Sequence, residues 1–185
     1  MWLVLAERLV VTSTMTFSLG SIDAGPHDGF SPGGHFDLGV TFKDLRLAAE
    51  LDAGLWSDED APDDMPESGG YTRVGGAMRY YFTDLNVGNE RNKQSLLRLY
   101  VEAGIGRQMI DTPSFEIDRP DLALGFGMQQ QARLGKVTLG GQFGVRVLVS
   151  EAPAPSLVCR GACEAPAYRR HDLAMFFTMG FAVGR

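Results

Sequence analysis

The chain has 185 residues, of which 22% are charged, and its formal net charge is −6. This length suits a single domain with a sizeable core, and the acidic balance argues against nucleic acid as a partner. The sequence contains no uncharged apolar run of the length, about 18 residues or more, that a transmembrane helix needs.

The first residues, MWLVLAERLVV, lack the basic start and the uninterrupted apolar stretch of a secretory signal. The pattern of the remaining chain is that of an exported protein. We therefore expect that an export signal has been removed from this sequence.

Alternation of apolar residues with small or polar ones recurs along the whole chain. A period of two predicts β-strands whose two faces differ. The clearest example is KVTLGGQFGVRVLV at 136–149, where the odd-numbered positions are apolar, apart from a glycine, and the even-numbered ones are mostly small or polar. Eight strands are expected, at about 8–19, 36–42, 45–55, 73–82, 97–106, 122–131, 136–149 and 173–183.

The connections between these strands fall into two classes. KDL after the second strand and RLGK after the sixth predict tight hairpin turns, and a longer polar link follows the fourth. Long segments rich in Pro, Gly and acidic residues are expected at about 20–34, 57–70, 111–120 and 151–170. Long loops at one end and short turns at the other predict one up-and-down barrel over residues 1–185.

The apolar faces of the strands must meet either a protein core or lipid. Eight strands enclose an interior that only just holds their side chains, so these large apolar residues would overfill it. The strands are also about as long as a tilted strand that crosses a bilayer. We therefore expect the apolar faces to meet lipid, as in the last two strands at Leu139, Phe143, Val145, Val147, Met175, Phe177 and Phe181.

The opposite faces carry glycines together with charges of both signs. A crowded lumen suits such charges, because each one needs a partner there. The expected lumen charge network consists of Arg46, Glu50, Asp52, Arg73, Arg79, Arg98, Glu102 and Arg146. The predicted fold is therefore all-β: an eight-stranded antiparallel transmembrane barrel with a polar, closed lumen. A soluble lipocalin-like barrel that binds an apolar ligand remains the alternative, with its apolar faces pointing inward.

In pattern and topology, the chain resembles the OmpA/OmpX-like group of eight-stranded outer-membrane β-barrels of Gram-negative bacteria. The resemblance covers nearly the whole chain and rests on no diagnostic motif. It implies an outer-membrane location, with both termini in the periplasm and the long loops outside the cell.

Few residues suggest chemistry. Cys159 and Cys163, in CRGAC, are expected to form a disulfide in an oxidising compartment, with free thiols or a metal as lesser alternatives. The acidic run SDEDAPDDMPE lacks the spacing of a calcium loop. No metal site, cofactor or catalytic triad is expected, since His27, His35 and His171 lie at loops or strand starts, away from any strand serine. The aromatic residues Trp56, Tyr71, Tyr80, Tyr81 and Tyr168 are expected to form an interfacial girdle.

The sequence thus favours a non-catalytic outer-membrane protein that acts as an envelope scaffold, an anchor or a surface-recognition protein through its long loops. Its expected partners are outer-membrane lipid, lipopolysaccharide and other envelope proteins. A lipid-modifying outer-membrane enzyme remains a second alternative, which would need a side opening between strands.

Overall fold

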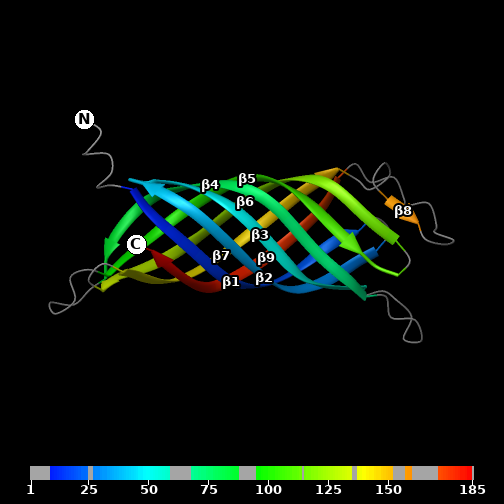
Figure 1. Cartoon of the computed structure of the whole chain (residues 1–185), viewed down its shortest axis with the longest axis horizontal. Helices are drawn as coiled ribbons and strands as arrows, with labels where there is room; N and C mark the ends of the chain where they lie inside the picture. The colour runs from blue at the N-terminus through cyan, green and yellow to red at the C-terminus, as the bar shows by residue number, and fades with distance from the viewer. Residues whose placement is uncertain are drawn as a thin grey trace.

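The computed structural model describes residues 9–24, 27–58, 68–87, 95–113, 115–134, 137–151, 157–159 and 171–184. They form β1 (Leu9–Ala24), β2 (His27–Phe42), β3 (Leu45–Asp58), β4 (Ser68–Asn86), β5 (Ser95–Asp111), β6 (Phe115–Leu134), β7 (Val137–Glu151), β8 (Leu157–Cys159) and β9 (His171–Gly184). Eight of these strands, all except β8, pair antiparallel in one closed ring (Figure 1). None of the described residues forms a helix long and apolar enough to cross a membrane.

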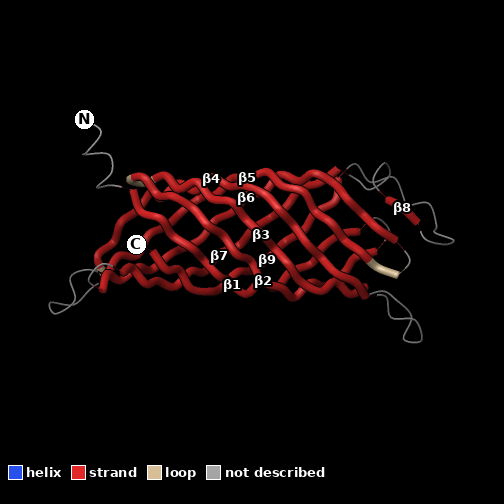
Figure 2. Tube along the Cα trace, viewed as in Figure 1, coloured by secondary structure: helices blue, strands red, loops and turns tan. Residues whose placement is uncertain are grey.

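The strands run obliquely around the barrel (Figure 2). Residues that lie opposite each other on neighbouring strands can be followed from Gln130 of β6 through every barrel strand, and they return to β6 at Pro120. An offset of this size in an eight-stranded ring tilts the strands by about 35–45° from the barrel axis. The predicted all-β, eight-stranded antiparallel barrel is confirmed.

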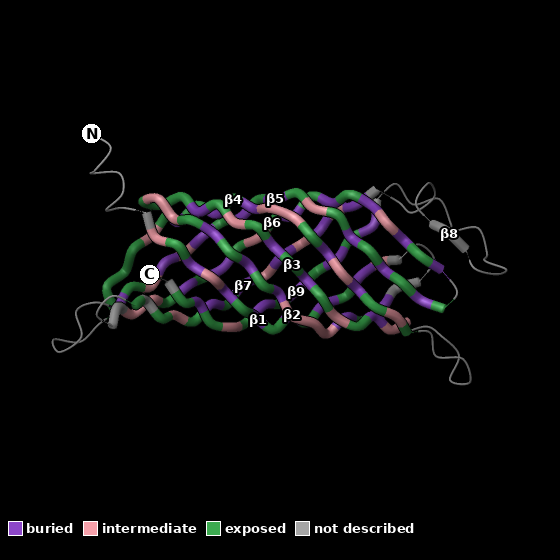
Figure 3. Tube along the Cα trace, viewed as in Figure 1, coloured by how far each residue is buried: buried purple, intermediate pink, exposed green. Residues whose placement is uncertain are grey.

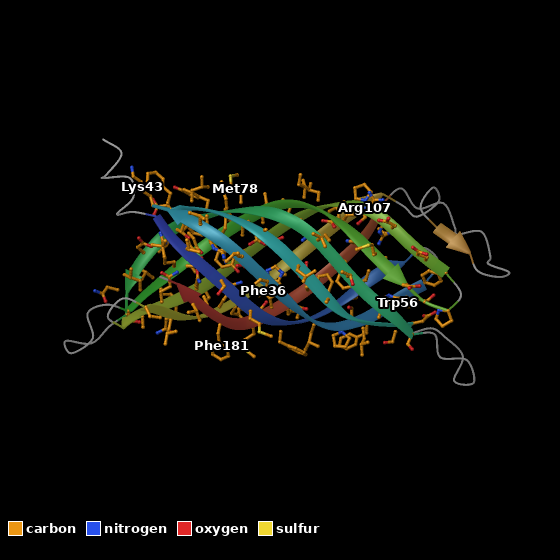
Figure 4. The ribbon with its side chains drawn as sticks, in the orientation of Figure 1. Phe36, Lys43, Trp56, Met78, Arg107 and Phe181 are labelled. Atoms are coloured by element: carbon orange, nitrogen blue, oxygen red, sulfur yellow. The ribbon has the colours of Figure 1, made fainter. Side chains whose placement is uncertain are left out.

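Exposed and buried residues alternate along every long strand (Figure 3). The exposed set is mostly large and apolar, and includes Phe181, which is 77% exposed, and Met15, which is 72% exposed. Met78 and Phe181 both project outward, on opposite sides of the barrel, in Figure 4. Because the apolar faces point outward, the barrel has the surface of a protein in lipid and not that of a soluble lipocalin-like binder.

The residues expected to face lipid lie on this outer wall. Leu139, Phe143, Met175, Phe177 and Phe181 are exposed, and Val145 and Val147 are half-buried.

Two of the four predicted long loops are wrong. β1 and β2 extend through most of the predicted loop 20–34 and leave only residues 25–26 between them. β5 and β6 likewise take up most of the predicted loop 111–120. The period of two continues through both segments, but in parts of them polar residues such as Ser21 and Glu116 face outward while Ile22 and Ile117 face inward, so the sequence there resembles a polar loop.

The other two predicted loops remain connections at the same end of the barrel. Asp58 and Ser68 bound one of them, and Glu151 and His171 bound the other. The second contains the short strand β8, which pairs with the first residues of β6. At the opposite end, Lys43 and Asp44 form the tight turn predicted after β2, with Lys43 at a φ of 54°.

A charge on the outer wall tests this assignment of faces. Val145→Arg should lower the free energy of unfolding in lipid vesicles by about 2–4 kcal/mol, because it places a guanidinium in hydrocarbon. Val145→Leu is the control, since it keeps this half-buried position of the wall apolar. Urea titration followed by heat-dependent gel mobility measures both. Equal stability of the two variants would show that the apolar wall does not meet lipid.

Candidate functional site

The centre of the barrel is filled by arginine–carboxylate pairs contributed from across the ring. Glu102 of β5 accepts hydrogen bonds from Arg79 Nη2 at 2.6 Å and from Arg146 Nη2 at 2.8 Å. Arg146 of β7 also donates to Glu50 of β3. One glutamate thus joins β4 to β7 through the lumen, and all of these side chains are buried.

Arg73 of β4 forms a second centre closer to the end that carries β8. Its Nε donates to both carboxylate oxygens of Asp121 at 2.9 Å. Its Nη1 reaches Glu50 at 3.0 Å and Asp52 at 3.3 Å. Glu50 and Asp52 therefore link this centre to Arg146, which lies 3.5 Å from Asp52.

A buried histidine lies between two carboxylates in the same lumen. His35 Nδ1 is 2.6 Å from Asp52 Oδ1, and Nε2 is 3.4 Å from Asp37 Oδ2. Asp37 also accepts a hydrogen bond from Arg46. Because each ring nitrogen faces a carboxylate, His35 serves both only with a proton on each nitrogen. Arg146 Nη1 lies 3.3 Å from Nδ1 and closes the remaining side.

The structure places all eight residues of the predicted lumen set inside the barrel. Shared partners bring seven of them together. Arg98 lies apart, near the turn between β2 and β3, where it donates to Asp84 at 2.5 Å and to Asp44 at 2.9 Å.

Sequence reasoning missed five residues of this lumen with acidic, guanidinium or imidazole side chains. They are His35, Asp37, Arg119, Asp121 and Asp172. Arg119 reaches from β6 to the Asp23 carbonyl at 2.7 Å and also pairs with Asp172. The strand period could have found them, because His35 lies two residues before Asp37, and Arg119 two before Asp121, so each pair shares a face.

The lumen is not polar throughout, which corrects the prediction of a polar interior. Towards the end that carries β8 it holds an apolar plug, consisting of Ile22, Trp56, Tyr71, Ile110, Phe115, Ile117, Ala123, Leu148, Ala174 and Phe176. The Trp56 and Phe115 rings meet edge to face at 5.6 Å, and Tyr71 stacks on Phe176 at 5.7 Å. Figure 4 shows Trp56 near this end of the barrel.

The plug also corrects the predicted aromatic girdle. Trp56, Tyr71 and Tyr81 are buried inside the barrel, while Tyr80 faces outward. Tyr168 lies outside the described residues.

The outer wall becomes polar at the level of the plug. Thr72, Arg107, Asp111 and Glu116 face outward there on β4, β5 and β6, and Met109, between Arg107 and Asp111, is 37% exposed. Arg107 donates to Asp118, and this hydrogen bond holds the pKa of that carboxyl below its usual value. Outside, this part of the barrel is more polar than the belt, and inside it the apolar plug lies beside the buried pair of Arg119 and Asp172. We call this part of the barrel the collar.

The packing of the lumen leaves little free space. A cavity among His35, Arg79, Glu102 and Arg146 has a volume of about 10 Å³, which is room for one water molecule. The network and the plug thus close the barrel in series along its axis.

The structure describes little of the remaining predicted sites. Cys163 and most of the acidic run lie outside the described residues, and for Cys159, His27 and His171 the structure describes only the backbone. In the described part of the chain, no three His, Cys, Asp or Glu residues are placed to hold a metal ion.

Comparison with known proteins supports the fold alone. No family model and no curated protein sequence matches the chain. Its structure is similar to that of Neisserial surface protein A, with 16% identity over 95% of this chain and 96% of that chain and a TM-score of 0.52. Looser likenesses are to Ail, the attachment invasion locus protein of Yersinia pestis, in complex with the heparin analogue sucrose octasulfate (10% identity, 95% and 99% covered, TM-score 0.45), and to a major outer membrane protein of Thermus thermophilus (14%, 94% and 99%, 0.38). The chain has the fold of the eight-stranded outer-membrane barrels.

Removing the shared carboxylate tests the lumen network. Glu102→Ala should lower the free energy of unfolding by about 3–5 kcal/mol, because two buried guanidinium groups, those of Arg79 and Arg146, each lose a carboxylate partner. The control is Asp118→Ala, which removes the exposed partner of Arg107 and should change stability little. Urea unfolding in detergent micelles measures both. A Glu102→Ala variant as stable as the control would show that the network adds nothing to stability.

Proposed function

We propose that this protein is a non-catalytic integral protein of the bacterial outer membrane, which presents the connections after β3 and β7 to the cell exterior for recognition or anchoring. The observation that carries the proposal is a filled lumen inside an apolar wall. With the described part of its lumen filled by the network and the plug, such a barrel offers partners its outer wall and its ends.

Transport through the barrel is disfavoured by the way the lumen is filled. A passage would require separating Arg79 and Arg146 from Glu102 and then displacing the plug around Trp56. Each broken buried pair costs about 3–5 kcal/mol. Since these barriers lie in series, thermal motion opens them together only rarely.

Catalysis is disfavoured by the surroundings of His35. A general base needs one ring nitrogen free to accept a proton from a nucleophile. Here Asp52 and Asp37 lie against the two nitrogens, Arg146 packs beside the ring, and the side chain is 3% exposed. His35 therefore acts as a structural cation between two carboxylates.

The two ends of the barrel differ, and the difference supports an orientation. The collar and the two long connections share one end, while the start of β1 and the end of β9 lie at the other, beside the short turns (Figure 1). The outer residues of the collar suit the polar headgroup layer better than hydrocarbon. We place the collar at the cell surface and both termini in the periplasm.

This orientation gives the partners their positions. The apolar belt contacts the acyl chains of outer-membrane lipid. The collar lies at the level of the lipopolysaccharide headgroups, and the long connections extend towards other envelope proteins or the exterior.

Labelling of intact cells tests the orientation. A short epitope inserted in segment 59–67 should bind antibody on intact cells, whereas the same epitope in segment 88–94 should bind only after the outer membrane is permeabilised. Heat-dependent gel mobility of both insertions serves as the folding control. The reverse labelling pattern would show that the barrel is inserted the other way round.

Solute flux tests the closed lumen. Liposomes that contain the folded protein should swell in small sugars no faster than protein-free liposomes, because both the network and the plug close the axis. Liposomes with an open porin provide the positive control. Swelling at a rate that rises with protein content would overturn the proposal of a non-transporting barrel.

A further inference from the structure

The apolar belt is not uniformly convex. An apolar groove with a volume of about 880 Å³ crosses its outer face, a size within the range of ligand pockets. Its lining includes Phe17 of β1, Met179 and Phe181 of β9, and Phe143 of β7. These side chains point out of the barrel and are 46–77% exposed.

The strand register explains the shape of this groove. One row of neighbouring outward residues runs Gly34, Phe17, Met179, Phe143 and Met128. The adjacent row, two residues away on each strand, runs Met15, Phe181, Gly141 and Gln130. With strands about 4.8 Å apart, the groove between these rows is about 19 Å long and about 7 Å wide from row to row.

Glycines make the groove deep. A Cβ added at Gly34 would have its nearest neighbour, the Thr16 carbonyl oxygen, at 3.8 Å, and one at Gly141 would have the Gly180 carbonyl oxygen at 4.0 Å. A side chain at either position would therefore meet only ordinary van der Waals contact. Phe17 lies beside Gly34 and Phe181 beside Gly141 on the neighbouring strands, and the methionines of the two rows have thioethers that adapt to an irregular apolar guest.

One end of the groove is polar. Gln130 is exposed on the outer wall beside Gly141, and its side-chain amide donates to Ser95 Oγ at 3.3 Å. It lies four residues from the end of β6, towards the short turns. An apolar groove that ends at an amide matches a lipid, with the hydrocarbon chain along the groove and the polar headgroup at the amide.

We propose that this groove holds one acyl chain of a phospholipid, with the headgroup at Gln130. Half of a bilayer's hydrocarbon core, about 15 Å, is the length available to one chain, and the groove is long enough to accept it. The choice of phospholipid rests on the proposed function, which places the Gln130 end towards the periplasm and thus in the inner leaflet.

Native mass spectrometry of protein extracted from membranes in mild detergent tests the proposal. The wild type should carry one phospholipid mass. Gly141→Leu fills the groove and should lower that occupancy about tenfold, because it displaces buried hydrocarbon. Gly76→Leu is the matched control: Gly76 is also a glycine of the outer wall within the belt, paired with Ala49 and Ile105, but it lies on β4, outside the groove. It should leave occupancy unchanged.

Several results would overturn the proposal. These are a wild type without bound lipid, equal lipid retention in Gly141→Leu, a retained mass of lipopolysaccharide, or a lipid-free dimer that Gly141→Leu dissociates. If Gly141→Leu fails to fold, Gly34→Leu fills the other end of the same groove. The heat-dependent gel shift is recorded in parallel: a wild type that folds without lipid contradicts only this inference, whereas one that never forms the shifted band contradicts the membrane barrel itself.

Discussion

The closed ring of hydrogen bonds is the constraint on which the rest of this structure depends. In hydrocarbon no water can satisfy a backbone N–H or C=O, so every strand must have a partner on both sides. β1 meets this need by pairing with β9, and β5 by pairing with β6. Once the ring is closed, each strand has one face towards lipid and one towards a narrow lumen, and the period of two assigns every side chain to one of them.

The side chains inside the lumen must then fill it and satisfy one another's charges. Long arginines reach across it and meet carboxylates from strands far away in the ring, as Arg146 of β7 meets Glu50 of β3. Buried ion pairs add little net stability over an apolar core but penalise every arrangement in which a charge loses its partner. The network is therefore better understood as fixing strand register and barrel shape than as a source of stability. His35 extends it between Asp37 and Asp52.

The sequence predicted the belt well and the collar poorly, for one physical reason. Within the belt, apolar residues alternate with polar or small ones, and lipid is the only solvent that suits the resulting outer wall. In the collar the alternation continues with its sense reversed: Ile22 and Ile110 turn inward, while Ser21 and Asp111 turn outward. Because these segments also contain acidic residues, Pro and Gly, the sequence there predicts loops. Arg119 and Asp172 were missed because their roles depend on partners from across the ring, and Trp56 was expected in an interfacial girdle although it lies in the plug.

Because of this reversal of polarity, the barrel buries apolar surface in two different ways. In the belt the apolar surface is outside and lipid covers it. In the collar the apolar surface is inside, and Trp56 and Phe115 exclude water from it as in a soluble protein. The connections after β3 and β7 start from the collar, at Asp58 and Glu151, and not from the level of the belt. A rigid, plugged collar therefore fixes the positions from which these connections leave the barrel, so the separation of any binding elements they carry is set by strand pairing.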